Sequence, residues 1–359
     1  MKNEQTVHVL IVDDTAMYRL ILDRAVSQIQ DTAVVGTAAN GEIALQKLAT
    51  SMVDLVLVDV FMPGMSGIET LQKIREKYPD IAVAMVSGVA TSDAEITIQA
   101  LNMGALDFVS KPKEKNAEES MRTLVEELKR VINAVRARGL VREKKVELKP
   151  TVSAPVLPRP SIKLAKIDLV VIGVSTGGPN ALGVVIPSLP QNLPCPVLLV
   201  QHMPPIFTAS LADHLSKKSA LQVREGIENE SIAPGTVWIA PGGKHMTIKH
   251  HPHDPSKYVL ALDESPPVNS CRPAVDVLFN SVASIFHGGV LAVILTGMGE
   301  DGANGTASLK HQHCYCLAQD EKTCVVYGMP RAIAERHLAD EVLPLDHIAP
   351  RIASLTGCS

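Results

Sequence analysis

Short apolar runs alternate with amphipathic segments through the first third of the chain. Five runs of mostly Val, Ile and Leu are separated by stretches of helical spacing, and they occupy residues 7–12, 34–38, 55–60, 82–86 and 108–109. Near-continuous apolar runs of this length are typical of parallel strands that are buried on both faces of a sheet. The pattern predicts an α/β domain of five βα units with a parallel sheet, over residues 1–130.

A similar pattern returns in the second half of the chain. Apolar runs occupy residues 169–174, 196–200 and 290–295, and each is followed by a turn of polar residues or glycines. Strands of one parallel sheet deliver the residues that follow them to the same edge. We therefore expect a second α/β domain over residues 167–359.

The segment between the two patterns differs from both in charge. Residues 131–166 carry nine basic and two acidic side chains, and Pro150, Pro155, Pro158 and Pro160 follow one another closely. Proline fixes φ and removes a backbone donor, so such a segment favours an extended connection. The segment is predicted to be a basic, proline-containing linker between two acidic domains.

Composition and charge narrow the class of protein. With 359 residues, 46% apolar and 20% charged, the chain is long enough for more than one globular domain. Only 3% of residues are aromatic and the net charge is −4, which argues against nucleic acid as a partner. We expect a cytoplasmic protein without membrane insertion, since neither a signal peptide nor an apolar stretch of spanning length is present. The six cysteines form no Cys-x-x-Cys pair, so neither a disulfide framework nor a zinc knuckle is expected.

Polar residues follow the predicted strands of the first domain. Asp13 and Asp14 come after the first strand, Asp59 ends the third, and Ser87 and Lys111 follow the fourth and fifth. Three neighbouring carboxylates repel one another unless a cation lies among them, and an all-oxygen site suits Mg2+. An ammonium and a hydroxyl beside them would bind phosphoryl oxygens. Asp59 is predicted to be the nucleophile of a phosphoryl transfer.

These motifs identify a resemblance that covers residues 6–130. The matching positions are Asp13-Asp14, Asp59 with Met62-Pro63 and Gly67, Ser87, and Lys111-Pro112. Together they resemble the receiver domain of bacterial response regulators. The resemblance implies phosphotransfer from a histidine kinase to Asp59, with Mg2+ held by Asp13, Asp14, Asp59 and the backbone carbonyl of Phe61.

The same resemblance assigns a switch to the receiver domain. Phe108 matches the aromatic position that repacks when Ser87 moves toward the phosphoryl group. An ordinary core phenylalanine is the alternative interpretation of Phe108.

Three residues with complementary chemistry follow strands of the second domain. Ser175 lies in the glycine-rich turn at 173–179, His202 follows the run at 196–200, and Asp301 lies in the turn after 290–295. A hydroxyl, an imidazole and a carboxylate at one sheet edge can form a nucleophile, a general base and an orienting acid. A dinucleotide-binding turn at Ser175 is the alternative, but its middle glycine is replaced by Ser175.

Each member of this set has an alternative interpretation when taken alone. A histidine at a strand end is often structural, an acid in a glycine loop is often a turn former, and Glu300 adjoins Asp301. The order Ser, His, Asp also differs from the Ser, acid, His order of α/β-hydrolases. We expect Asp301 to be the orienting acid. We also expect the fold to differ from that of the α/β-hydrolases.

The second half resembles a known family over residues 167–357. The matching segments are Ser175-Thr176-Gly177-Gly178, Gln201-His202-Met203-Pro204, Ala240-Pro241-Gly242, Arg272-Pro273-Ala274-Val275-Asp276, and Thr296-Gly297-Met298-Gly299 with Asp301-Gly302. They resemble the catalytic domain of chemotaxis protein-glutamate methylesterases. The resemblance implies a doubly wound domain that hydrolyses glutamyl methyl esters on chemoreceptors, releases methanol and deamidates receptor glutamines, with no cofactor for the esterase chemistry. The Met298 N–H matches an oxyanion donor.

Several alternatives stay open. The tract at 311–316 contains His and Cys residues that a metal site could use, although its alternation favours a strand, and Cys271 is either a second nucleophile or an ordinary loop thiol. A binding protein that recognises receptors without chemistry, and an esterase or amidase of small molecules, are the alternative functions.

Overall fold

The computed structural model describes residues 6–88, 90–111, 117–147 and 166–358. The chain divides into two compact units, Met1–Val146 and Glu147–Ser359, and each is described by itself. Pro112 and the proline-containing part of the predicted linker, residues 148–165, lie outside the described residues.

The first unit contains the predicted five-stranded parallel sheet, in the order β2-β1-β3-β4-β5. The strands are β1 (Val7–Val12), β2 (Thr32–Ala38), β3 (Leu55–Asp59), β4 (Ala82–Ser87) and β5 (Asp107–Ser110). Every residue of β3 and β4 is buried, as their unbroken apolar runs predict. The carboxyl ends of β1 and β3 are adjacent because these strands pair directly.

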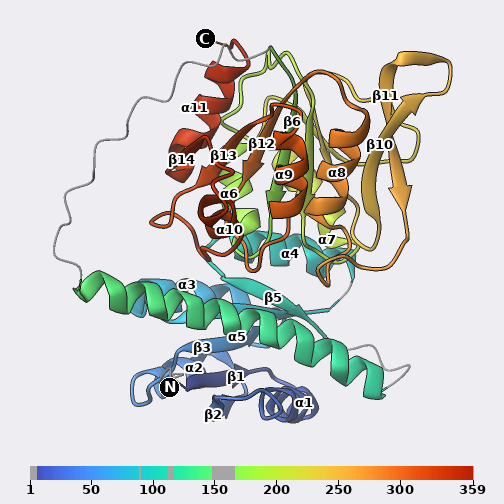
Figure 1. Cartoon of the computed structure of the whole chain (residues 1–359). Coiled ribbons are helices and arrows are strands. Elements are labelled where there is room, and N and C mark those ends of the chain that lie inside the picture. The colour runs from blue at the N-terminus through green and yellow to red at the C-terminus, as the bar shows by residue number, and fades with distance from the viewer. Residues whose placement is uncertain (1–5, 89, 112–116, 148–165, 359) are drawn as a thin grey trace. The chain divides into compact units, whose positions relative to one another are not determined.

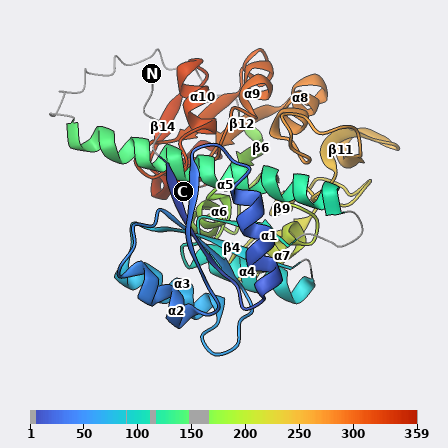
Figure 2. The same cartoon turned by 90° about the horizontal axis from the view of Figure 1, so that it is seen from below.

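Helices connect the strands of the first unit. They are α1 (Ala16–Val26), α2 (Gly41–Leu48), α3 (Gly67–Lys77), α4 (Thr91–Asn102) and α5 (Ala117–Glu147). Helices α2 and α3 pack against each other, as Figure 2 shows. Helix α5 continues through residues 131–147, so the first part of the segment predicted as a linker is helical.

The start of α3 is defined by local chemistry. Ser66 and Glu69 form a capping box, in which the Ser66 hydroxyl accepts from the Glu69 N–H and the Glu69 carboxylate accepts from the Ser66 N–H. Gly67 follows at once, and a Cβ atom there would lie 2.1 Å from the backbone oxygen of Asp59. Glycine is therefore required for the helix to begin directly behind Asp59.

The second unit is built on a seven-stranded parallel sheet in the order β14-β13-β12-β6-β7-β9-β8. The strands are β6 (Ile167–Val174), β7 (Val197–Gln201), β8 (Gln222–Glu225), β9 (Thr236–Ile239), β12 (Gly289–Ile294), β13 (Tyr315–Gln319) and β14 (Glu341–Leu343). An antiparallel hairpin that the apolar pattern did not predict comprises β10 (His245–His251) and β11 (Asp254–Asp263).

Helices of the second unit form two groups. The helices are α6 (Gly178–Val185), α7 (Phe207–Ser216), α8 (Val275–Ile285), α9 (Ala303–Lys310), α10 (Met329–Glu335) and α11 (Leu345–Leu355). Helix α9 contacts α8 and α10, whereas α6 contacts α7 and α11. Figure 1 shows α8 and α9 side by side in front of the strands.

The order in which the chain adds strands to this parallel sheet reverses at β6. From β6 the chain adds β7, β8 and β9 on one side, and it returns to add β12, β13 and β14 on the other. In open α/β sheets, ligand sites form at the carboxyl edge next to such a reversal. Ser175, His202 and Asp301 all follow strands that meet at this edge. Among the described helices, none has the length and apolar character needed to cross a bilayer.

Replacing Gly67 by Ala tests the packing behind Asp59. The added methyl group would meet the Asp59 carbonyl oxygen, so we expect the free energy of unfolding of the first unit to fall by about 1–3 kcal/mol in urea titrations. Gly139→Ala is the matched control, because nothing lies within 4 Å of its Cβ position, and it should leave stability unchanged or raise it by up to about 1 kcal/mol. Equal stability of the Gly67→Ala variant and the wild type would contradict the packing argument.

Candidate functional sites

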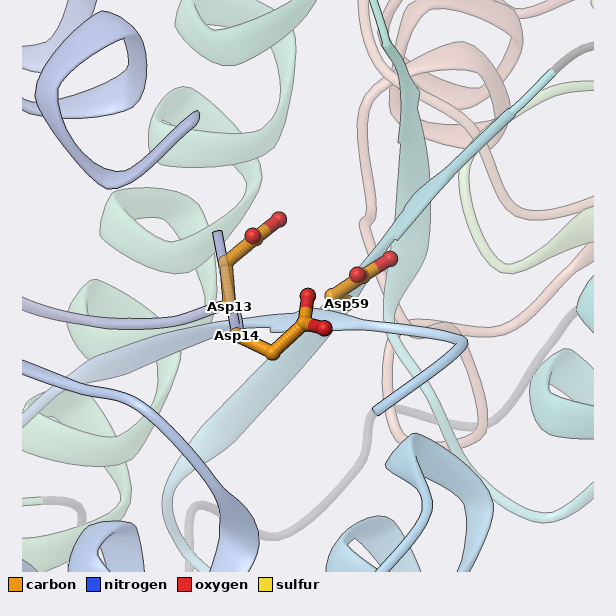
Figure 3. A group of neighbouring side chains, drawn as sticks. All are labelled: Asp13, Asp14 and Asp59. Carbon is orange, nitrogen blue, oxygen red and sulfur yellow. The ribbon is translucent and has the colours of Figure 1, made fainter. Parts of the chain in front are cut away.

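The predicted acidic cluster is present at the carboxyl edge of the first sheet. One carboxylate oxygen from each of Asp13, Asp14 and Asp59 lies within 4.8 Å of the others. Figure 3 shows the three side chains gathered at the ends of β1 and β3. Asp13 and Asp59 are buried, whereas Asp14 is exposed. The set offers only oxygen ligands, so the cluster suits a hard divalent cation.

Lys111 supplies the positive charge that this cluster needs. Its Nζ lies 2.8 Å from Asp59 Oδ2 and 3.0 Å from Asp13 Oδ2, and it also lies over the ring of Tyr18. Burial lowers the pKa of Lys111, but the two hydrogen bonds outweigh burial and raise it overall. Burial raises the pKa of Asp59 to about 6 against the opposing effect of Lys111. The ammonium therefore partly offsets the cost of two buried carboxylates.

The two predicted switch residues also lie at this end of the sheet. The Ser87 hydroxyl, at the end of β4, accepts a hydrogen bond of 2.7 Å from the Thr97 hydroxyl of α4 and donates to the Gly88 carbonyl. Phe108 lies in β5 and is 2% exposed. Ser87 therefore connects the strand end to α4, while the Phe108 ring lies within the core.

Neighbouring strand ends bring Ser175 and His202 to one edge of the second sheet. Strand β6 ends at Val174 and pairs with Gln201 at the end of β7, so Ser175 and His202 are the next residues of adjacent strands. The His202 N–H donates to the Val174 carbonyl, and the Gln201 side-chain amide donates to the carbonyls of Ser175 and His202 at 3.0 and 3.1 Å. Gln201 thus joins the two turns through their backbones.

Asp301 reaches the same edge from the turn after β12. Its Oδ2 lies 2.8 Å from His202 Nε2, and both side chains are buried. Glu300 is exposed, so Asp301 rather than Glu300 makes the contact with the imidazole. Burial raises the pKa of Asp301, but the interaction with His202 outweighs it and lowers that pKa overall.

The second nitrogen of His202 contacts a thiol. Cys271 Sγ lies 3.4 Å from His202 Nδ1, and the described residues give no hydrogen bond between Nδ1 and the Ser175 hydroxyl. Burial lowers the pKa of His202, but the hydrogen bonds to Asp301 and Cys271 outweigh burial and raise it to about 9. Cys271 is thus a neighbour of the imidazole, which its position beside Arg272 in the sequence did not reveal.

The backbone beside Ser175 is close-packed and presents a donor. A Cβ atom at Gly297 would lie 2.8 Å from the Ser175 Cβ, so only glycine lets the turn after β12 approach the serine. The Ser175 N–H donates to the Thr296 carbonyl at 3.0 Å. The adjacent N–H of Met298 makes no hydrogen bond to the described residues and remains available to an anion.

The tract at 311–316 leads into a strand, as its alternation predicted. Strand β13 begins at Tyr315, and Cys316 to Gln319 are buried. All six cysteines are free thiols. Among the described residues, the group of acidic, His or Cys side chains close enough together to hold a metal ion is that of Asp13, Asp14 and Asp59.

The sequence did not single out Asn269 or Asp276, yet both touch Asp301. The Asn269 side-chain amide donates to Asp301 Oδ1 at 2.9 Å and to Asp276 Oδ2 at 3.1 Å. Asp276 was named only as the last residue of the matching segment at 272–276, and Asn269 lies three residues before that segment. A reciprocal pattern of hydrogen bonds between two loops leaves no local signal in a single sequence.

These features define a class of protein. The first unit has a five-stranded sheet with an acidic edge and a half-buried lysine, and the second is a doubly wound unit with Ser, His and Asp at one edge. This is the organisation of a response regulator with an enzymatic output domain. Two family models match accordingly: "Response regulator receiver domain" over residues 9–122 and "CheB methylesterase" over residues 170–352.

Relatives of known name span the full chain. A protein-glutamate methylesterase/protein-glutamine glutaminase from Desulfotalea psychrophila is 42% identical and covers 98% of each chain. One of the same name from Thermotoga maritima is 40% identical over 98% of this chain and 99% of its own. The crystal structure of the Thermotoga maritima CheB methylesterase catalytic domain matches 53% of this chain and 99% of its own, with 43% identity and a TM-score of 0.50. The chain belongs to the CheB methylesterase family.

The protonation of His202 gives a direct test of the Asp301 and Cys271 contacts. Because both contacts favour the charged imidazole, we expect His202 to stay protonated until the pH approaches about 9, and Asp301→Asn or Cys271→Ala should lower its pKa. Nitrogen-15 NMR titration of the imidazole measures this value. His214 is an internal control, since burial lowers its pKa and neither substitution touches it. A His202 that titrates near 6.5 in the wild type would contradict the assignment.

Proposed function

We propose that the chain is a protein-glutamate methylesterase and protein-glutamine glutaminase under the control of phosphorylation. Its substrates are glutamyl methyl esters and glutamines on the cytoplasmic domains of methyl-accepting chemoreceptors, and its place is the cytoplasm. Family membership supports the reaction class. The observation that carries the proposal is the 2.8 Å contact between buried His202 and Asp301 at the strand edge that also holds Ser175.

In this proposal the two imidazole nitrogens have separate roles. Nε2–H donates to Asp301, so Nδ1 is the nitrogen left to accept the proton of the Ser175 hydroxyl. Because Nδ1 contacts Cys271 in this structure, the reaction begins with an exchange in which Nδ1 leaves the thiol for the hydroxyl. Asp301 stabilises the imidazolium that results.

The proposed reaction then proceeds through two tetrahedral intermediates. Ser175 Oγ attacks the ester carbonyl carbon, and the oxyanion accepts a hydrogen bond from the Met298 N–H. The imidazolium returns the proton to the departing methoxide, and methanol leaves an acyl-Ser175 intermediate. Water, deprotonated by His202, attacks that intermediate and releases the glutamate carboxylate and Ser175. A glutamine follows the same steps with ammonia as the leaving group.

The first unit supplies the control in this proposal. A histidine kinase would donate a phosphoryl group to Asp59, and Asp13, Asp14 and Asp59 would hold Mg2+, which would neutralise phosphoryl charge. Lys111, already paired with Asp59, is placed to contact a phosphoryl oxygen. Movement of Ser87 toward that group would break its hydrogen bond with Thr97 and let Phe108 repack. In this proposal residues 1–130 are the receiver, residues 167–359 are the catalytic domain, and residues 131–166 lie between them, of which 131–146 belong to the first compact unit.

Ser175→Ala tests the assignment of the nucleophile. Loss of a triad serine lowers the rate by up to about 10⁶-fold, so methanol release from methylated receptor should fall to near background. Labelling of the wild type by a fluorophosphonate should disappear in the same variant. Near-normal methanol release by Ser175→Ala would exclude the mechanism. Absent labelling of a folded wild type would favour a receptor-binding protein without chemistry, and activity on small esters alone would favour a small-molecule esterase.

Asp59→Asn tests the control by phosphorylation. The amide keeps the size of the side chain but cannot accept a phosphoryl group, so stimulation of methanol release by a phosphodonor with Mg2+ should be lost while basal activity remains. The matched control is Asp54→Asn, which changes an exposed aspartate that contacts His8 in the same unit. Equal stimulation of Asp59→Asn and the wild type would place the phosphorylation site elsewhere.

A further inference from the structure

Asp301 caps a helix as well as contacting His202. Helix α8 begins at Val275, and its N-cap residue Ala274 has no side chain that can accept a hydrogen bond from the first turn. Asp301 replaces that cap from another loop, since its Oδ2 accepts the Val275 N–H at 2.7 Å and its Oδ1 accepts the Asp276 N–H at 3.1 Å. The first amides of α8 thus hold both oxygens of Asp301.

Asp276 makes the reciprocal contact with the helix that follows Asp301. Helix α9 begins at Ala303 after Gly302, which has a φ of 92° and, as a glycine, no side chain that could cap the helix. Asp276 Oδ1 accepts the Gly302 N–H at 3.0 Å and the Gly305 N–H at 2.7 Å. Asp301, which precedes α9, therefore caps the N-terminus of α8, and Asp276, which lies in α8, caps the N-terminus of α9.

Asn269 connects the two carboxylates. Its side-chain nitrogen donates to Asp301 at 2.9 Å and to Asp276 at 3.1 Å. The residue is exposed at the surface and has a φ of 52°, a left-handed conformation that asparagine tolerates better than most residues. A single amide donor therefore lies between two buried acids.

The charges explain why such an arrangement is needed. Burial and the nearby charge of Asp301 both raise the pKa of Asp276, so the charge of Asp301 opposes the ionisation of Asp276. Helix N-termini favour negative charge through their amides and dipoles, and Asn269 adds a donor to each acid. The set lets two acids stay ionised together in the interior.

We propose that Asp276 and Asn269 are positioning residues that keep the Asp301 carboxylate ionised and directed at His202 Nε2. The proposal deepens the proposed function, since it names the residues through which the orienting acid is held. Asp276 acts by fixing the turn that carries Asp301 to the start of α8, and Asn269 acts by offsetting the repulsion between the acids. Neither contacts the reacting atoms.

The test uses full-length Asn269→Ala and Asp276→Asn. We expect kcat/KM for methanol release to fall about 10-fold to 100-fold in each, because misplacement of a catalytic group by about 1 Å has a cost of that size. The pKa of His202, measured by nitrogen-15 NMR, should fall below its wild-type value because Asp301 no longer favours the imidazolium as strongly. Asn269→Ala removes an exposed side chain and keeps the test available should Asp276→Asn not fold.

Asp340→Asn is the control for a purely structural effect. Asp340 accepts the Cys316 N–H at 2.7 Å and pairs with Lys310, and it touches none of His202, Asp276 and Asp301. It should lower stability without moving the pKa of His202. A fall in kcat/KM with an unchanged pKa in Asn269→Ala and Asp276→Asn, or no change in either quantity, would overturn the proposal. If the pKa of His202 falls in these variants but the wild type releases no methanol, the positioning roles are supported and the esterase function is refuted.

Discussion

The second unit depends on keeping the carboxylate of Asp301 charged in the interior of the protein. A buried carboxylate is costly unless donors surround it, and Asp301 has four: His202, the first two amides of α8 and the Asn269 amide. The four donors come from three places: a strand end, the start of a helix and a loop. The sheet edge, the start of α8 and the turn before α9 must therefore all be in place for this single charge to be stable.

Each of the two units holds a pair of buried carboxylates, but the groups that stabilise the two pairs differ. In the receiver unit, buried Asp13 and Asp59 share the ammonium of Lys111, a mobile charge on a flexible side chain. In the catalytic unit, Asp276 and Asp301 are held by backbone amides and one asparagine, which have little freedom to move. An acid that receives a phosphoryl group, the role proposed for Asp59, needs a partner that can move away, whereas an acid that orients a histidine, the role proposed for Asp301, benefits from fixed donors.

The sequence predicted the parts of the structure that depend on local pattern. The buried strands of both sheets follow from apolar runs, and the strand ends carry Asp13, Asp59, Ser175 and His202 to their edges because parallel topology leaves few alternatives. The β10–β11 hairpin, the contact of Cys271 with His202 and the pairing of Asp276 with α9 were not predicted. These features depend on contacts between loops that are distant in the sequence. Neither hydrophobic periodicity nor the residue type at a single position predicts such contacts.

The Cys271 contact bears on how the proposed base would work. A histidine with a pKa of about 9 is mostly protonated at neutral pH, which reduces the fraction of molecules whose Nδ1 can accept a proton. The same high pKa makes the neutral fraction a stronger base, so the two effects partly offset each other. Cys271 contributes to the high pKa through its hydrogen bond to Nδ1, the nitrogen that must turn to Ser175. An ester substrate that separates the thiol from Nδ1 would thereby remove one cause of the raised pKa. Binding of substrate and release of the base for catalysis would then be one event.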